Sequence, residues 1–164
     1  MKPFHKYVAE YKRQLEKGAI QAAYKGLMEY IMALRTHLKN KYPDYIVSGS
    51  IYAGYMDMTY FAFTPKALAQ RKLKVAIVFI HATCHFEIWL GGYNKQVQAT
   101  YWKLFKESGW NKYRLVPTTA GADSIIECVL TDTPDFSDLD ALTQHIERAT
   151  LTFIKDVERF LSTR

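Results

Sequence analysis

Long apolar segments are absent from the sequence. The longest uninterrupted run, Val75 to Ile80, has the length of a strand, whereas a membrane span needs about 20 residues. A secretory signal is missing too, because Met1 to Lys6 leads straight into an amphipathic pattern. Cysteine is scarce: Cys84 and Cys128 are too few for a disulfide framework, and we expect both to be thiols. We therefore expect a cytoplasmic protein with no membrane partner.

Repeats, linkers and low-complexity tracts are also absent, so the 164 residues are expected to form one domain, residues 1–164. Aromatic residues, in contrast, are plentiful. They make up 15% of the chain, with twelve Tyr, nine Phe and three Trp. Tyr is readily half-buried with its hydroxyl in water, so this richness points to rings at a surface or in a groove.

Apolar residues recur at helical spacing near both ends of the chain and once in its second half. The spacing predicts a helix from Pro3 to Lys17 that ends at Gly18, a second helix from Ala19 to about Lys41, a third that is capped by Asn94 and ends at Gly109, and a long final helix after a capping box of Ser137 and Asp140.

The segment that follows the second helix is rich in Ile, Val, Tyr, Phe and Thr, which is typical of strands. We predict strands at Ile46–Tyr52, Met56–Phe63, Leu73–Ile80 and Phe86–Leu90, a helical turn at Lys66–Arg71, and short strands at Lys112–Pro117 and Ser124–Leu130. The short connections exclude parallel crossovers. The fold class is therefore α+β, with an antiparallel sheet of about four to six strands covered by N-terminal, central and C-terminal helices.

His81, Cys84 and His85 form an H-x-x-C-H cluster of residue types that bind zinc or copper. Structural zinc sites usually need four ligands, and an extended backbone would not aim adjacent Cys84 and His85 at one point. No nucleophile motif surrounds Cys84. Turn residues without a metal are the simpler interpretation, and no cofactor is expected.

Asp57 and Glu87 each stand inside an apolar, strand-like run. If they converged with His81 and His85, the group could perform acid–base or metal chemistry, as in a hydrolase. Strand alternation exposes every second residue and explains both carboxylates without chemistry. The sequence contains no complete catalytic set, so an enzyme is the less favoured alternative.

The leading hypothesis is a non-catalytic ligand-binding or interaction protein. Its groove would lie between the aromatic face of the sheet and the helices, near Tyr55, Asp57, Trp89 and Tyr93, and would take a small molecule or a protein. Ordinary core packing is the competing interpretation of the rings, and a homo-oligomer stays open.

The net charge of +6 leaves a second alternative open, because Lys and Arg supply most of the attraction to nucleic-acid phosphates. The candidate cations are Lys12, Arg13, Lys39, Lys41, Arg71 and Lys72. They are spread over several elements, and solvated helix faces explain them equally well.

Several segments carry a family resemblance: Lys2–Phe4, Tyr24–Tyr30, Ser48–Tyr52, Gly54–Phe61 and Gly92–Lys95. With them the chain resembles an uncharacterised family of small bacterial proteins catalogued only as a domain of unknown function. The resemblance spans nearly the whole chain. It implies a bacterial, stand-alone cytoplasmic protein, and it brings no activity or catalytic residue.

Overall fold

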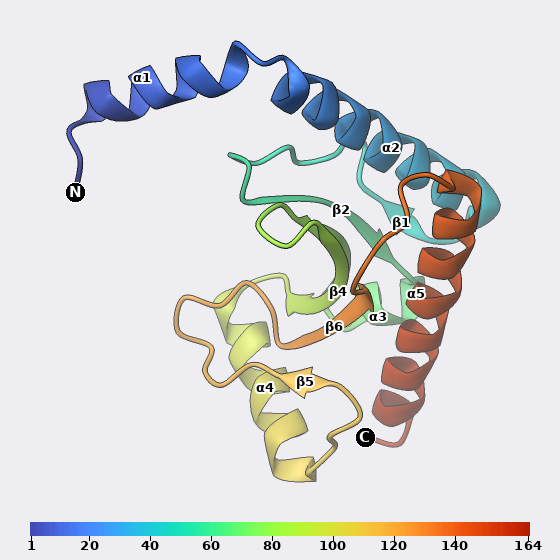
Figure 1. The fold of residues 1–164 in the computed structure, drawn as a ribbon. Coiled ribbons are helices and arrows are strands. Elements are labelled where there is room, and N and C mark those ends of the chain that lie inside the picture. The colour runs from blue at the N-terminus through green and yellow to red at the C-terminus, as the bar shows by residue number, and fades with distance from the viewer.

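The computed structural model describes residues 1–164 (Figure 1). The helices are α1 (Phe4–Leu15), α2 (Ala19–Lys41), α3 (Lys66–Gln70), α4 (Lys95–Ser108) and α5 (Leu139–Ser162). The strands are β1 (Ile46–Val47), β2 (Met58–Thr64), β3 (Leu73–Ile80), β4 (His85–Gly92), β5 (Arg114–Leu115) and β6 (Ile126–Thr131). No helix combines the length and the apolar character that crossing a membrane requires.

All six strands belong to one sheet in the order β1-β2-β3-β4-β6-β5, and every neighbouring pair is antiparallel. The predicted α+β class is thus confirmed. The β3–β4 hairpin lies at the centre, where Leu73 faces Gly92 and Ile80 faces His85. The four-residue turn between these strands is too short for any other pairing direction.

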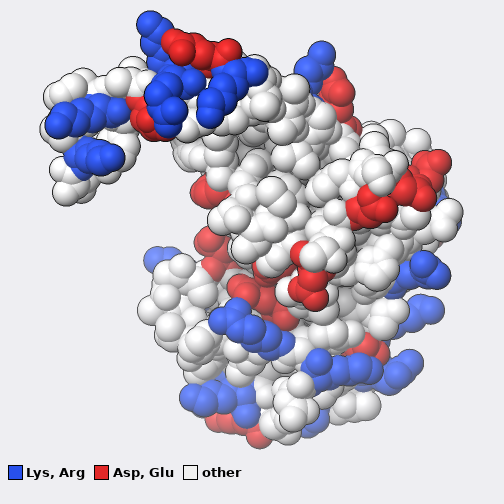
Figure 2. Space-filling view, viewed as in Figure 1, with Lys and Arg blue, Asp and Glu red and all other residues white.

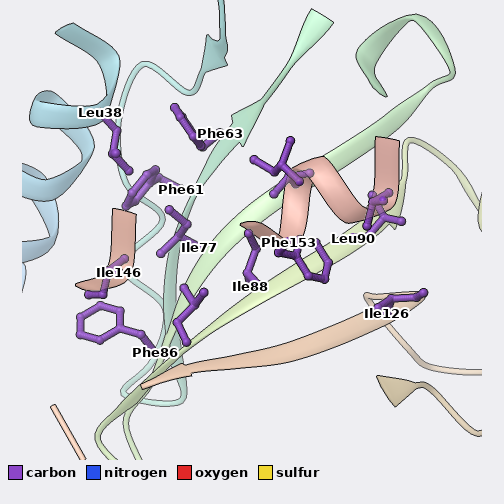
Figure 3. Packing of buried hydrophobic residues seen from close by; sticks show 14 of the residues in the cluster. Leu38, Phe61, Phe63, Ile77, Phe86, Ile88, Leu90, Ile126, Ile146 and Phe153 are labelled. Carbon is purple, nitrogen blue, oxygen red and sulfur yellow. The ribbon is translucent and has the colours of Figure 1, made fainter. Parts of the chain in front are cut away.

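The main core lies between one face of the sheet and the helices α2 and α5, which Figure 1 shows on the same side. Alternate strand residues such as Phe61, Ile77 and Ile88 are buried there against Phe153 of α5 (Figure 3). Burying each such side chain stabilises the fold by roughly 1.5–3 kcal/mol. The C-terminal end of α5 also packs against α4, because Phe160 stacks on Phe105 with ring centroids 4.9 Å apart.

The two strand predictions before Thr64 were too long. Only Ile46 and Val47 pair with β2, and Tyr52 adds one isolated bridge to Tyr60. The second strand begins at Met58 because Gly54 and Met56 have positive φ angles of 73° and 63° and turn the chain. β5 is shorter than the predicted strand at Lys112–Pro117. β6 begins and ends later than the predicted strand at Ser124–Leu130.

Of the two predicted N-terminal helix caps, one is confirmed and one is wrong. Asn94 caps α4 as predicted, since its side chain accepts a hydrogen bond from the Val97 N–H at 2.9 Å. The Ser137 cap of α5 was wrong. Asp138 takes that role by accepting from the Ala141 N–H, because the Ser137 hydroxyl instead donates to Asp135.

Candidate functional site

The face of the sheet opposite α2 and α5 carries a second set of side chains, which alternate with the core residues. Pairing places Tyr60, Val78 and Glu87 in one row across β2, β3 and β4, and Ala62, Ala76 and Trp89 in the next row. Apart from Val78, these residues are only partly buried. Large rings therefore lie on either side of small alanine side chains on this face.

A groove of about 450 Å³ lies on this face, and we call it the aromatic groove. Its lining residues are Tyr52, Met58, Tyr60, Lys74, Ala76, Val78, Trp89, Gly91, Gly92 and Asp123. The volume falls in the range of small-molecule sites, which run from roughly 300 to 1,000 Å³. Three aromatic rings and one lysine are the chemically informative groups in this lining.

Trp89 is held in place along its own strand. Its indole N–H donates to Glu87 Oε1 at 3.0 Å, and His85 Nε2 lies 2.5 Å from Glu87 Oε2. The side chains of His85 and Glu87 are only 17% and 16% exposed. Because both carboxylate oxygens are engaged by neighbours, Glu87 orients the Trp89 ring and is not free to act as a base on a ligand in the groove.

Tyr52 and Tyr60 form the other aromatic side of the groove. Their backbones exchange two hydrogen bonds, at 2.8 and 3.0 Å, and their ring centroids are 4.9 Å apart. Cross-strand aromatic pairs of this kind stabilise each other, so the rings are ordered before any ligand arrives. At one end, the Lys74 ammonium lies 4.7 Å from the ring centre of Tyr93.

Gly91 and Gly92 let α4 approach the end of β4 closely. A Cβ at Gly92 would lie 2.6 Å from the Gln98 backbone nitrogen, and the Gln98 side chain accepts a hydrogen bond from the Gly92 N–H. A second hollow of about 620 Å³ lies next to the helix start and shares Gly92 and Asp123 with the aromatic groove. It contains no aromatic side chain, so we centre the candidate site on the groove.

The four predicted site residues line different parts of the surface. Trp89 lines the aromatic groove. Tyr93 does not line the groove, but its ring contacts the ammonium of Lys74, which does. Tyr55 is 91% exposed and lines a separate hollow beside α1 and α2. Asp57 stabilises the turn that follows Tyr55, since its carboxylate accepts a hydrogen bond from the Tyr55 N–H at 2.9 Å. Hydrogen bonds from the backbone N–H groups of Tyr55 and Met58 lower the pKa of Asp57.

The H-x-x-C-H residues each have separate surroundings. His81 is hydrogen-bonded to Thr59 Oγ1 at 2.8 Å and packs beside Phe79, and burial lowers its pKa against the opposing effect of Asp57. Cys84 is exposed in the turn with a φ of 51°. No group of three or more His, Cys, Asp or Glu side chains is arranged to hold a metal ion.

The residues of the hydrolase hypothesis fall into two separate pairs, His85 with Glu87 and His81 with Asp57. His85 and Glu87 lie on the face of the aromatic groove, because they alternate with buried Phe86 and Ile88. His81 contacts Thr59, which alternates with Tyr60 and is fully buried towards the core. The arrangement therefore brings together no set of four acid–base groups.

The six cations of the nucleic-acid hypothesis are distributed over α1, α2 and the α3–β3 connection, and three of them have partners within the protein. Arg13 pairs with Glu10, Lys41 pairs with Glu147, and Arg71 donates to the Leu161 carbonyl. Figure 2 shows basic and acidic side chains interspersed over this side of the molecule.

Tyr52, Tyr60 and Lys74 were not among the predicted site residues, although all three line the groove. Strand alternation carries part of the signal, because Tyr60 must point away from Phe61 and Phe63, just as Trp89 points away from Ile88 and Leu90. The strand register, which places Ala76 of β3 beside Trp89 of β4, cannot be predicted from the alternation of apolar and polar residues.

Comparison with known proteins places the chain by family. The family model of a domain of unknown function (DUF7000) matches residues 4–161. This match confirms the predicted resemblance. No curated protein and no solved structure matches the chain.

Proposed function

We propose that this chain, which belongs to the DUF7000 family, binds a planar ligand with an anionic group in the aromatic groove and does so without catalysis. The observation that carries the proposal is the fixed Trp89 ring, held by Glu87 and His85, across the groove from the paired rings of Tyr52 and Tyr60. Ordered rings lose little conformational entropy on binding, which favours affinity.

The shape and polarity of the groove support this ligand class. Ala76, Gly91 and Gly92 carry small side chains or none, which leaves room for a flat ring system among the aromatic residues. Lys74 supplies a cation at the end near Tyr93, where a carboxylate or phosphate of the ligand would find its counter-charge. Apolar walls with a few convergent polar groups are the usual composition of small-molecule sites.

The fold supports binding over chemistry in this groove. Glu87, which lies beside the groove, uses both oxygens within the protein. Asp123 is the one carboxylate among the lining residues, and the lining contains no histidine or second acid that could act with it. General acid–base catalysis needs a group free to exchange a proton with the substrate. Lys74, the other charged side chain of the lining, suits charge recognition.

The test uses the three indole N–H resonances of Trp89, Trp102 and Trp110 in ¹⁵N-labelled protein. Indole-3-acetate and adenosine monophosphate serve as planar anionic probes, and hexanoate serves as a non-planar anion. We expect a saturable shift of the Trp89 resonance with at least one planar probe. The Trp102 resonance should stay constant, because Trp102 lies outside the groove and its N–H donates to the Val116 carbonyl.

Variants then tie the shift to the groove. Tyr60→Leu and Lys74→Ala should each weaken binding of the planar anion at least about 5-fold, because stacking and ion pairing each contribute on the order of 1–3 kcal/mol. Val129→Ala is the matched control, since Val129 lies on the same face beside Glu87 but outside the groove. Equal shifts of all three indole resonances, or binding insensitive to Tyr60→Leu, would refute the proposal.

A further inference from the structure

The N-terminal helix α1 has an apolar stripe that nothing in the chain covers. Phe4, Tyr7, Val8 and Tyr11 recur at helical spacing and are 81%, 50%, 46% and 61% exposed. The helix contains no buried residue, whereas α2, α3, α4 and α5 each bury at least one. An isolated helix of twelve residues is marginally stable in water, so α1 needs a packing partner.

Figure 1 shows α1 projecting away from the sheet, joined to α2 by a bend. Gly18, directly before α2, has a φ of 76°. The inner side of this bend forms an apolar hollow of about 360 Å³. Tyr11 and Leu15 of α1 line it together with Ile20 and Tyr24 of α2 and Tyr55 and Met56 of the following loop. The molecular surface is visibly hollowed beneath α1 (Figure 2).

The exposed apolar area has the size of a stable interface. The rings of Phe4, Tyr7, Tyr11 and Tyr55 together expose roughly 550 Å², at about 200 Å² for a fully exposed aromatic side chain. Val8, Ile20 and Met56 are 46%, 38% and 49% exposed and extend the same surface. The total approaches the roughly 800 Å² per partner of a standard interface and exceeds the patches of most monomers.

We propose that a second copy of this chain covers this surface, with α1 of each copy lying in the hollow of the other. Each chain supplies both parts of the contact, an unpartnered amphipathic helix and an apolar hollow beside it, so a two-fold exchange covers both at once. The cations Lys6 and Arg13 lie on the opposite side of the helix and stay in water.

The geometry favours a second copy over a lipid surface. A basic amphipathic helix that binds a bilayer presents its apolar side outwards to a flat surface. In α1, Tyr11 and Leu15 face the hollow, across from Tyr24 and Tyr55 of the same chain. A rod-shaped partner can enter this concave surface, and a planar bilayer cannot reach it.

The test measures the mass of the full chain by sedimentation equilibrium over a range of concentrations. The wild-type protein should be a dimer at tens of micromolar. Val8→Glu should weaken dimerisation at least about 100-fold, because each dimer would bury two unpaired carboxylates. Tyr55→Ser should weaken it from the side of the hollow. Lys6→Glu is the matched control, since it introduces the same carboxylate on the outer side of α1, and it should leave the dimer intact.

Circular dichroism should show that each variant loses no more helix than the twelve residues of α1, because Val8 and Tyr55 are exposed and support no other element. A wild-type monomer at 100 µM, or a dimer that Val8→Glu and Tyr55→Ser leave unchanged, would overturn the proposal. So would a monomer that sediments with phosphatidylserine vesicles and loses this binding on Val8→Glu, because the bilayer would then be the partner of α1. None of these results depends on binding in the aromatic groove.

Discussion

Thr150 on α5 is fully buried, yet its hydroxyl has no hydrogen-bond partner within the protein. The other buried side-chain polar atoms are bonded; the hydroxyl of Thr64, for example, accepts from the Val75 N–H at 3.1 Å. Burying a hydroxyl without a partner costs about 1–3 kcal/mol. Thr150 is therefore a position where the polar residue lowers the stability of the fold.

Thr150→Val should raise the free energy of unfolding by about 1 kcal/mol, because valine has the same shape without the unpaired hydroxyl. Urea denaturation of both proteins measures the difference. Thr152→Val is the matched control on the same helix. Thr152 is exposed, so its substitution should change stability by less than about 0.5 kcal/mol. A loss of stability in Thr150→Val would mean that the hydroxyl has a partner after all.

Two carboxylates attach α5 to other elements. Glu147 lies 3.1 Å from the Lys41 ammonium at the end of α2 and 3.3 Å from His37 Nε2. Asp156 accepts a 2.6 Å hydrogen bond from the Tyr113 hydroxyl, and Lys112 approaches it to 3.1 Å. The long helix is thus joined by charge and hydrogen bonds to α2 at one point and to the segment before β5 at another.

Acid should weaken the second attachment. The Tyr113 hydrogen bond, followed by Lys112, holds the pKa of Asp156 below its ordinary value near 3.8. A lowered carboxyl pKa stabilises the fold above the ordinary pKa, and the contribution is lost as pH falls through the lower folded-state value. Tyr113→Phe should therefore cost about 1–2 kcal/mol at pH 7, where the carboxylate is charged, and less as the pH approaches 3.

Urea titrations of the wild type and Tyr113→Phe at pH 7, 5, 4 and 3 measure how the difference in their free energies of unfolding changes with pH. Tyr93→Phe is the control, since that side chain is 47% exposed and lies beside a lysine. Its small effect should not vary with pH. A cost of Tyr113→Phe that stays constant down to pH 3 would show that the hydroxyl does not depend on the charged carboxylate.

Helices and strands with a regular spacing of apolar residues could be predicted from the sequence. Elements whose bounds depend on turn geometry could not. The sequence spacing predicted α2 from Ala19 to Lys41 and β3 from Leu73 to Ile80 with the observed bounds. It overextended β1, because β-rich composition at Ser48–Tyr52 does not reveal that only Tyr52 bridges back to Tyr60. The α5 cap failed because Asp135 and Ser137 bond to each other, a competition between polar residues that spacing alone cannot resolve.

In the candidate site, too, the orientation of a side chain on its strand could be predicted, whereas the grouping of residues from different segments could not. Alternation placed Trp89 on the face opposite Ile88, and that orientation holds. Tyr55 and Tyr93 were grouped with it by proximity in the sequence, but the left-handed turn at Gly54 and Met56 carries Tyr55 to the hollow beside α1. The sharing of the groove among Tyr52, Tyr60 and Trp89 depends on strand register, which arises only when the whole sheet is assembled.

Charge is unevenly distributed along the molecule. Residues 1–41 contain nine Lys and Arg against three acidic residues, whereas residues 115–147 contain seven acidic residues and no Lys or Arg. The net charge of +6 is therefore not a uniformly basic surface. Charge asymmetry of this kind acts at long range on the orientation of an approaching partner, and salt should weaken that effect.

Local stability should also vary strongly across the molecule. β3 and β4 pair with strands on both sides and bury Val75, Ile77, Ile88 and Leu90 completely. α1, at the other extreme, buries no residue. Amides that are exposed by local opening exchange far faster than those that need global unfolding. Hydrogen exchange followed by mass spectrometry should thus rank the elements by the packing described above.

At sub-micromolar protein concentration, peptides of α1 should exchange at least about 1,000-fold faster than peptides covering Leu73–Ile80 and His85–Gly92, because opening α1 disrupts no core contact. Raising the concentration should slow exchange in α1 selectively, since a second copy would then cover Tyr7, Val8 and Tyr11. α4 is the internal control: its Asn94 cap and buried Phe105 lie within the chain, so its exchange should not depend on concentration. Exchange in α1 that stays fast at every concentration would leave the helix without a partner and contradict the dimer, whereas protection in α1 even at the lowest concentration would mean that the helix packs within its own chain.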